Sequence, residues 1–260
     1  MSTNGSNIAA GAQQRALSTE TARRLGLPRV EWFNEVGSTL DVAHALAVDG
    51  AEAGTLIIAD AQTAGRGRMG RTWASEPRAG LWLTMIERPR DVSALDVLSL
   101  RVGLALAPVL DAFSDLPVRV KWPNDLYVGA RKLAGILIEA RWRDGVPDWA
   151  AIGVGINVRP PVTEANAAGL RSGTDRVAVL HAVVPAVRSA AAKLGPLGDA
   201  ELADFAERDL ARGRPCTSPT VGRVVGIDAS GALVVDVASD GGASHMVLVR
   251  AGSLVLTEDR

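Results

Sequence analysis

Cysteine and histidine are scarce in this chain, and their scarcity excludes whole classes of site. Cys216 is the single cysteine among 260 residues, so neither an internal disulfide nor a CxxC metal site can form. The three histidines, His44, His181 and His245, are scattered and show no HExxH spacing. We therefore expect no zinc ion held by the protein, and we interpret each histidine as a surface or packing residue.

The sequence also lacks a strong net charge, a long apolar run and a leader. Its formal net charge is −1, whereas bulk electrostatic binding of nucleic acid normally needs a strongly basic face. No apolar run approaches the ~20 residues of a membrane span. The polar start, residues 2–7, has no basic segment followed by an apolar core. These absences predict a cytoplasmic protein that binds neither DNA nor a membrane.

The length of 260 residues suffices for one sizeable domain and one small domain. We expect a flexible segment over residues 1–25, with a short helix at about 18–25, and then a main domain over residues 26–212. From residue 213 onward, short strands alternate with turns at 228–231 and 239–242. This change of pattern predicts a small β-barrel over residues 213–260.

Hydrophobic periodicity predicts both helices and strands in the main domain. Apolar or alternating runs predict strands at 30–33, 55–59, 81–86, 118–121, 126–128, 131–140 and 150–158. Helical spacing predicts helices at 39–48, 94–113, 177–194 and 199–212, with Pro108 kinking or splitting the second. The main domain is therefore of the α/β or α+β class.

The most informative segment is residues 62–75, QTAGRGRMGRTWAS, which follows the predicted strand at 55–59. Its central part, residues 65–71, holds three glycines and three arginines. Glycine lets the backbone approach a ligand closely, and arginine binds phosphate or carboxylate through a planar fork. We call residues 65–71 the arginine–glycine loop and expect it to close over an anion.

Two nucleotide-binding motifs match this loop only in part. Residues 65–70 fit the dinucleotide fingerprint GxGxxG, and residues 65–72 are one residue from a P-loop. Both motifs must open a helix, but Pro77 and Gly80 interrupt the residues that follow. A third interpretation, binding of RNA through the charges of the loop alone, stays open at this point.

A second group of polar residues lies in residues 118–140, VRVKWPNDLYVGARKLAGILIEA. The pattern predicts a strand, a Pro-Asn-Asp turn, a second short strand and a return strand after Gly129. Four polar residues then gather near the strand ends: Lys121, Asn124, Asp125 and Lys132. Two cations, an amide and an acid suit an anionic ligand that carries a metal ion. The alternative is a hairpin with solvated charges, and we interpret Trp122 and Tyr127 as packing residues.

Several motifs occur in one order along the chain. They are Ser38-Thr39, GRGRMGR at 65–71 with Trp73 and Ser75, KWPND at 121–125, KLAGIL at 132–137 and IGVGIN at 152–157. Together these motifs resemble a biotin–protein ligase, and residues 226–233 resemble the small C-terminal domain of the same enzymes. The resemblance spans residues 30–256 and keeps the order of the family throughout, which makes it specific.

The resemblance implies a fold, an activity and partners. The fold is an α/β (α+β) catalytic domain with a mixed sheet, of the biotin/lipoate ligase type, followed by a small SH3-like β-barrel. The activity is ATP-dependent biotinylation of a lysine on a biotin carboxyl carrier protein through biotinyl-5′-AMP. It uses ATP and Mg²⁺, and the protein is a monomer or weak homodimer. Because residues 1–29 leave no room for the DNA-binding domain of some relatives, we expect the enzyme-only form.

The resemblance also implies roles for individual residues at the reacting groups. Arg68 would clamp the biotin carboxylate and the α-phosphate, Lys132 would bridge the same groups, and Asp125 would orient or deprotonate the incoming lysine. The other residues expected to bind ATP are Arg71 at the outer phosphates, Trp73 at adenine, Asn157 at the ribose, Lys121, and Asn124, which would also contact Mg²⁺.

The resemblance implies a set of biotin-binding residues as well. Ser38, Thr39 and Gln62 would hydrogen-bond the ureido ring. The remaining expected biotin contacts are Leu40, Gly65, Arg66, Gly67, Gly135, Ile136, Leu137 and Gly153. Other interpretations stay open for four of the residues named so far. Trp73 could be a core aromatic, Asn157 a turn residue, Asp125 a residue that pins its turn, and Gly153, like Gly155, a relief of packing.

The chain departs from the family at two places. Leu40 stands where the family usually has asparagine, and residues 253–258 lack the arginine that some relatives bring to the phosphates. Arg250 or Arg260 could substitute for it. The closest alternative among enzymes is a lipoate–protein ligase, which shares the expected architecture and chemistry. The presence of both KWPND and GRGRMGR favours the biotin–protein ligase over it. A non-catalytic RNA-binding module is the alternative from another class.

Overall fold

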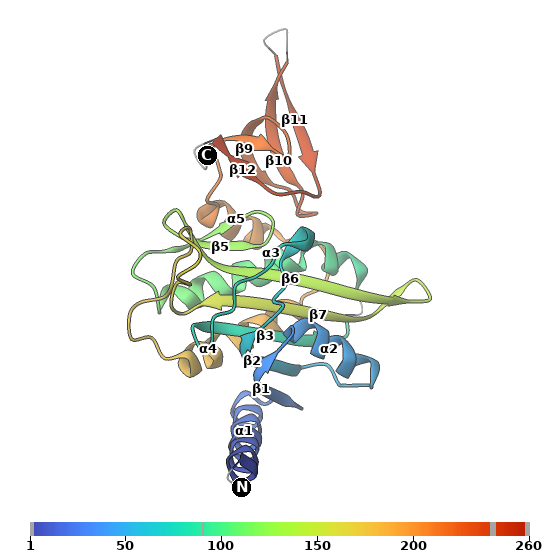
Figure 1. Ribbon diagram of the computed structural model, residues 1–260. Coiled ribbons are helices and arrows are strands. Elements are labelled where there is room, and N and C mark those ends of the chain that lie inside the picture. The colour runs from blue at the N-terminus through green and yellow to red at the C-terminus, as the bar shows by residue number, and fades with distance from the viewer. Residues whose placement is uncertain (1–2, 90, 240–242, 258–260) are drawn as a thin grey trace.

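The computed structural model of the chain describes residues 3–89, 91–239 and 243–257, with side chains from residue 14 onward. Two β-sheets lie one above the other in Figure 1. The large sheet and its helices come from the first four fifths of the chain, and the small sheet comes from its C-terminal end.

The large sheet has seven strands in the order β1-β2-β3-β7-β6-β5-β4. Their bounds are β1 (Val30–Val36), β2 (Thr55–Gln62), β3 (Gly80–Glu87), β4 (Val118–Lys121), β5 (Asp125–Val128), β6 (Arg131–Arg143) and β7 (Val146–Asn157). β1 pairs with β2 in parallel, and every other neighbouring pair is antiparallel. The predicted mixed sheet is thus confirmed, and each predicted strand of the main domain is present.

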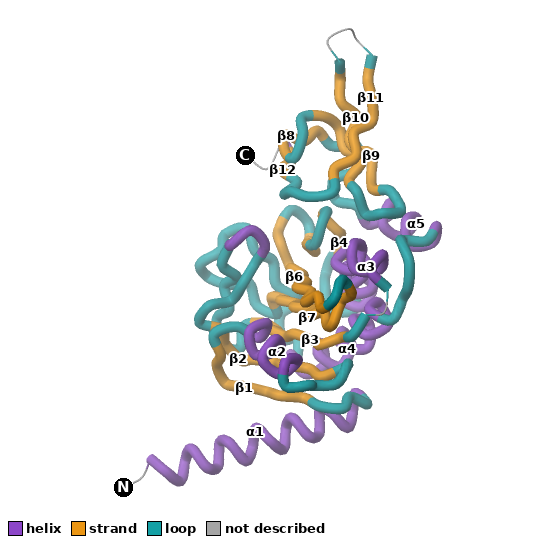
Figure 2. Tube along the Cα trace, turned by 90° about the vertical axis from the view of Figure 1, so that its right-hand side faces the viewer, coloured by secondary structure: helices purple, strands orange, loops and turns teal. Residues whose placement is uncertain are grey.

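Alternation along the strands decides which face each helix covers. Leu56 and Ile58 of β2 pack into the larger core with α3 (Val92–Asp111) and α4 (Arg176–Ala191), whereas Ile57 between them packs with α2 (Thr39–Val48). Successive side chains of a strand point to opposite faces. The apolar run 56–59 of β2 therefore needs helices on both faces of the sheet (Figure 2).

Helix α3 begins and ends two residues earlier than predicted, and Pro108 does not split it. The helix is continuous from Val92 to Asp111 with Pro108 inside it. Its 20 residues are long and apolar enough to cross a membrane by length and composition, a feature that sequence inspection missed because Asp96 and Arg101 interrupt the run. Here α3 packs against α4 and the sheet, and half of its most apolar stretch is buried. It is a core helix of this fold.

The N-terminal segment also differs from its prediction. Helix α1 (Thr3–Leu25) replaces the flexible segment expected over residues 1–25 and extends the short helix expected at 18–25. Its last turns are held by β1, because Trp32 N donates to Ser18 Oγ at 3.1 Å and Thr21 is buried. The first part of α1 points away from the rest of the chain in Figure 2.

The C-terminal part forms an antiparallel five-stranded sheet in the order β11-β10-β9-β8-β12. The strands are β8 (Pro215–Ser218), β9 (Gly222–Ile227), β10 (Leu233–Ala238), β11 (Ser244–Val249) and β12 (Val255–Leu256). α5 (Asp199–Arg208) precedes them and ends four residues before the predicted end. There the chain turns to pair Leu210 N with Val120 O at 2.9 Å. The described strands fit the predicted small β-domain, and its closure into a barrel stays a prediction.

Candidate active site

The arginine–glycine loop folds as a small hairpin. Backbone hydrogen bonds join residues 65–67 to residues 71–73, including one from Gly67 N to Arg71 O at 2.7 Å. The 3₁₀ turn η1 (Arg68–Gly70) forms its tip, where Gly70 takes φ 72° and Met69 φ 56°. Gly70 therefore occupies a left-handed position that favours glycine. As predicted, the residues after the hairpin form no helix.

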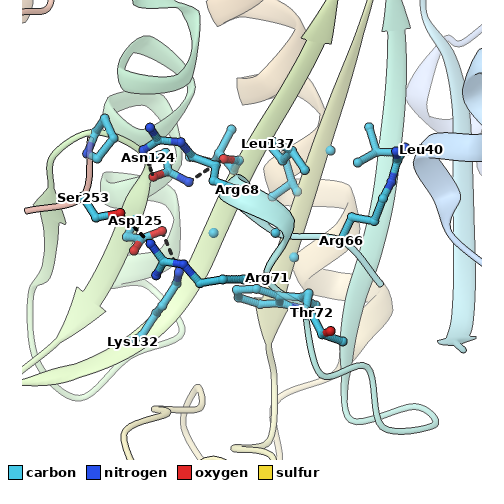
Figure 3. A pocket seen from close by; sticks show the side chains of 18 of the residues that line it. Leu40, Arg66, Arg68, Arg71, Thr72, Asn124, Asp125, Lys132, Leu137 and Ser253 are labelled. Atoms are coloured by element: carbon cyan, nitrogen blue, oxygen red, sulfur yellow. Dashed lines mark hydrogen bonds and ion pairs between the residues drawn. The ribbon is translucent and has the colours of Figure 1, made fainter. Parts of the chain in front are cut away.

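The hairpin covers one end of a cavity of about 400 Å³, which we call the first cavity (Figure 3). Its walls come from the start of α2, the hairpin, the β4–β5 turn, β6, β7 and the end of the chain. Among the lining residues are Ser38, Thr39, Leu40, Gln62, Arg66, Gly67, Arg68, Arg71, Trp73, Lys121, Asn124, Asp125, Lys132, Gly135, Ile136, Leu137, Gly153 and Ser253. The cavity has a polar uncharged end, an apolar middle and a cationic end.

The polar uncharged end lies where β1 passes into α2. Ser38 caps α2, because its Oγ accepts from Leu40 N at 3.3 Å. Gln62 Oε1 accepts from Thr39 N at 2.8 Å and from Thr39 Oγ1 at 3.1 Å, and Thr84 Oγ1 donates to Thr39 Oγ1 at 2.8 Å. These bonds hold a set of hydroxyl and amide groups in fixed positions, where they can bind a small polar neutral group.

The middle of the first cavity is apolar because Leu40, Ile136 and Leu137 line it, and Gly153 leaves room for Leu40. A Cβ at Gly153 would lie 3.3 Å from both Cδ atoms of Leu40 and 3.1 Å from Leu137 O. Leu40 is buried and packs directly over Gly153. Leucine at residue 40, where asparagine was expected from the resemblance, therefore contributes an apolar side chain to the wall of the cavity.

Arg68 lies at the cationic end of the first cavity (Figure 3). Its Nη1 donates to Asn124 Oδ1 at 3.0 Å and its Nη2 to Gly252 O at 3.1 Å. Burial lowers the pKa of Arg68, with a smaller lowering from Arg71, against the opposing effect of Asp125. A guanidinium that is partly desolvated and bonded to neutral oxygens favours an anionic ligand.

Lys132 lies beside Arg68 at the same end. Its Nζ forms an ion pair with Asp125 Oδ1 at 2.7 Å and lies 5.2 Å from the centre of the Trp73 ring. The β5–β6 register brings the two residues together, because Asp125 pairs with Gly135 and Tyr127 with Lys132. An ammonium group in this position can be drawn toward either its carboxylate or an incoming anion.

Trp73 is seated on two glycines that face each other across neighbouring strands. Gly135 of β6 pairs with Gly155 of β7. A Cβ at Gly135 would lie 2.8 Å from Trp73 Cζ3, and one at Gly155 would lie 2.7 Å from Trp73 Cε2 and Nε1. The indole therefore occupies the space that two side chains would fill, and Gly155 has a specific packing role.

A second cavity of about 600 Å³ adjoins the first and shares four lining residues with it, Thr72, Trp73, Tyr127 and Lys132. Its other walls come from Ala74, Ala130, Asn157, Pro161, Glu164, Asn166 and Ala167. Asn157 is buried, its Nδ2 donates to Lys132 O at 3.4 Å, and its Oδ1 has no hydrogen-bond partner in the part of the chain that the structure describes. A buried acceptor without a donor indicates a place for a ligand N–H or O–H group.

Comparison with known proteins agrees with this geometry. A family model described as the Biotin/lipoate A/B protein ligase family matches residues 32–157. The biotin–[acetyl-CoA-carboxylase] ligase of Mycobacterium tuberculosis is 33% identical over 249 residues, which are 88% of this chain and 90% of that protein. The chain belongs to the biotin protein ligase family. Sequence motifs, fold and cavities thus converge on one family of ligases.

Solved structures of the family match most of this chain. The biotin protein ligase of Aquifex aeolicus in complex with biotin and ATP has the same fold, with a TM-score of 0.70, 24% identity and coverage of 88% of this chain and 99% of that chain. The Leishmania major ligase in complex with biotinyl-5-AMP gives a TM-score of 0.56 at 26% identity, covering 85% and 98%.

Some relatives match only in part. The bifunctional ligase/repressor BirA of Bacillus spizizenii is 39% identical over 124 residues, which are 47% of this chain and 38% of that protein. The chain thus spans well under half the length of the first curated relatives that it matches.

The fold brings nearly all the residues predicted for biotin and ATP to the two cavities, and two of them lie differently from the expectation. Gly65 is outside both linings, because a Cβ there would lie 2.5 Å from Trp73 O and 2.9 Å from Ser75 Oγ. Arg66 lines the first cavity, but its guanidinium forms ion pairs with Asp41 and Glu139.

Sequence reasoning missed several residues that line the cavities. Tyr127, interpreted as a packing residue, lines both cavities, and Trp122 lines the first while its Nε1 donates to Gly231 O at 2.9 Å. Ser253 reaches the hairpin, where its Oγ accepts from Arg71 Nη2. No motif marks Ser253, since its place follows from how the small sheet packs on the large one.

Of the two expected substitutes for a C-terminal arginine, Arg250 is not among the described residues that line the first cavity. Arg250 donates to Ser230 Oγ at 3.3 Å, and Arg260 lies outside the described residues. The segment at the cavity is instead Ser253, Leu254 and Val255. The C-terminal part thus reaches the site through a hydroxyl and apolar groups.

The donor set for Mg²⁺ is small. Within residues 3–89, 91–239 and 243–257, no group of three His, Cys, Asp or Glu side chains is placed to hold a metal ion. Asn124 Oδ1 and Asp125 Oδ1 are oxygen donors at the cationic end, and both are engaged with cations. Mg²⁺ usually keeps several waters and binds through one or two carboxylates plus substrate phosphates. These residues fit Mg²⁺ that arrives with ATP, and the role of Asn124 stays a prediction.

Proposed function

We propose that this chain is a biotin–protein ligase that activates biotin with ATP and transfers it to a lysine of a biotin carboxyl carrier domain. One observation carries the proposal. Two cavities of unlike character meet at Lys132 and Trp73, and Arg68 lies at the cationic end of the first cavity. That arrangement suits a reaction that joins a small carboxylic acid to a nucleotide.

The chemistry requires both cavities. A carboxylate is a poor acyl donor, since its leaving group would be an oxide. In the first step a carboxylate oxygen of biotin attacks the α-phosphorus of ATP, the bond to the β-phosphate oxygen breaks, and pyrophosphate leaves. In the second step the lysine amine attacks the acyl carbon, AMP leaves, and the amine loses a proton. The first step brings two anions together, so cations at the junction lower its barrier.

The first cavity supports biotin as the acid. The ureido ring of biotin offers one carbonyl oxygen and two N–H groups, which complement the hydroxyl and amide groups of Ser38, Thr39 and Gln62. Leu40 and Leu137 would contact the thioether ring and the aliphatic side chain of biotin. The carboxylate would then reach Arg68 and Lys132 at the opposite end.

The second cavity supports ATP as the other substrate. Trp73 presents an indole between the cavities, and the partnerless Oδ1 of Asn157 offers an acceptor for the nucleoside. Arg71, whose Nη2 donates to Ser253 Oγ, can exchange that neutral hydroxyl for a phosphate oxygen. The biotin protein ligase of Leishmania major was solved in complex with biotinyl-5-AMP, so a related protein binds the product of the proposed first step.

Asp125 is the candidate proton acceptor for the second step. A lysine amine with a pKa of about 10.4 is mostly protonated at neutral pH and must lose a proton before it attacks. When Lys132 moves toward the adenylate phosphate, the carboxylate of Asp125 loses its partner at 2.7 Å. It is then free to orient the incoming amine and accept its proton.

ATP–pyrophosphate exchange tests the proposal directly. The chain is incubated with Mg²⁺, ATP and labelled pyrophosphate, with biotin, lipoate or octanoate in parallel. Exchange with biotin alone supports the proposed function and its substrate. Exchange with lipoate alone keeps the chemistry and overturns the substrate, and a folded sample without exchange overturns the ligase assignment. Transfer of biotin to a purified carrier domain, followed by mass spectrometry of its lysines, tests the second step.

A further inference from the structure

The three arginines of the arginine–glycine loop have different partners. Arg68 bonds to an amide oxygen and a carbonyl, and Arg71 bonds to a hydroxyl. Arg66 alone of the three has carboxylates within 4 Å among the described residues: Asp41 Oδ1 at 3.0 Å and Glu139 Oε2 at 3.2 Å from its Nη2. The charge of Arg66 is thus neutralised within the protein, while Arg68 and Arg71 remain available to anions.

Glu139 is itself held in place from the other side. Its Oε2 lies 2.8 Å from His44 Nε2, and Trp149 Nε1 lies 3.0 Å from His44 Nδ1. Because an indole N–H can only donate, His44 Nδ1 accepts and its proton is on Nε2, which donates to Glu139. A chain of contacts therefore runs from Trp149 through His44 and Glu139 to Arg66, and it joins β7, α2 and β6 to the hairpin.

The Arg66 side chain also points away from the cationic end of the first cavity, where Arg68 lies. In Figure 3 its side chain extends toward Leu40, away from the group formed by Arg68, Asn124, Asp125 and Lys132. Arg66 lies on the first arm of the hairpin, opposite Thr72. Among the described residues, the direct hydrogen-bond partners of Arg68 and Arg71 near the tip are neutral groups, which a ligand can replace, whereas Arg66 on the first arm is held by ion pairs.

We propose that Arg66 is a positioning residue, and that its ion pairs with Asp41 and Glu139 fix the first arm of the hairpin so that closure over the adenylate is confined to residues 67–71. The inference rests on the proposed function and adds to it, since Asp41, Glu139 and His44 then act on catalysis without touching a substrate. His44 acts by fixing the carboxylate of Glu139.

Glu139→Gln and Arg66→Met separate this role from direct binding of substrate. Glu139→Gln keeps the shape of the side chain and removes its charge. If Arg66 positions the hairpin, both variants raise the KM for biotin and the rate of release of biotinyl-5′-AMP without carrier. We expect about tenfold, since a hydrogen bond to a charged group contributes about 1.4 kcal/mol or more. The kcat of exchange at saturating substrate stays close to that of the parent.

Direct binding of a substrate anion by Arg66 predicts a different set of changes in KM and kcat. If Arg66 binds a substrate anion, Glu139→Gln releases the guanidinium and lowers the KM, while Arg66→Met lowers kcat. That pair of results would overturn the proposal. A double-mutant cycle gives a second readout, because loss of one shared contact makes the double variant no worse than either single variant. Additive effects also contradict the proposal, and Arg66→Lys, which retains the charge, should recover part of the loss.

Controls distinguish the possible failures. Asp115→Asn removes a comparable ion pair, Arg171–Asp115 at 2.8 Å, on the surface far along the chain from the hairpin; it should leave the biotin KM and adenylate release unchanged. Thermal unfolding shows whether each variant is folded. A parent protein without biotin-dependent exchange refutes the proposed function, whereas an active parent with unchanged Glu139→Gln and Arg66→Met refutes the inference alone.

Discussion

Gly155→Ala should displace Trp73 and weaken the use of ATP more than the use of biotin. A Cβ at Gly155 would lie 2.7 Å from two atoms of the indole, a separation too short for van der Waals contact. The strand cannot retreat, because β7 is paired on both sides, with β3 and β6. The indole is therefore the part that moves, since Trp73 is only half-buried and lies on the hairpin.

The magnitude follows from the contacts that Trp73 loses. Its ring lies edge to face with Trp82, with centroids 6.4 Å apart, and such pairs contribute about 0.5–1.5 kcal/mol. Lys132 Nζ lies 5.2 Å from the ring centre, and a cation–π contact at an accessible site contributes about 0.5–1 kcal/mol. Losing both costs about 1–2.5 kcal/mol, which is a factor of roughly 5–70.

The assay is steady-state ATP–pyrophosphate exchange, with the KM for ATP and for biotin measured separately. Gly155→Ala should raise the KM for ATP by the factor above. Gly103→Ala is the matched control, because a Cβ at that buried helical position would lie 3.5 Å from its nearest neighbour, an ordinary contact. An unchanged KM for ATP in folded Gly155→Ala would refute the reasoning that the glycine pair seats Trp73.

Three further predictions follow from the same structure. Gly153→Ala, whose Cβ would meet Leu40 at 3.3 Å, should raise the KM for biotin with little effect on that for ATP; equal effects on both would contradict separate cavities. Arg68→Gly should release biotinyl-5′-AMP that modifies nearby lysines, read by mass spectrometry of a bystander protein, and modification of the carrier alone would contradict the clamp. Burial raises the pKa of Asp209 to about 6, outweighing the Ala211 N–H and Arg119. When a carboxyl group has a higher pKa in the folded than in the unfolded state, the free energy of unfolding falls as the pH rises between the two pKa values. For Asp209 the fall is about 3 kcal/mol between pH values of about 4 and 6. Asp209→Asn should flatten the dependence of the free energy of unfolding on pH in that window, and parallel profiles for parent and variant would refute the assignment.

Much of the fold was predictable because its signals are local. The apolar run of β2, the hairpin strands β4 and β5 and the Ser38 cap of α2 each depend on residues within a few positions of one another. The residues of the cationic end were also predictable, because the arginine–glycine loop and the KWPND and KLAGIL motifs are each short and continuous in the sequence. Of α1, only the last turns, residues 18–25, were predicted, because the residues before them show no apolar periodicity of their own.

The sequence by itself determined the family, the main elements and most of the side chains at the two cavities, since these follow from periodicity and motif order. Only the tertiary structure decided how those side chains are paired. It set Gly135 opposite Gly155 to receive Trp73, turned Arg66 toward Glu139, and brought Ser253 to Arg71 across 182 positions of the chain. Such pairings depend on strand register and on the packing of one sheet against another, which no local pattern encodes.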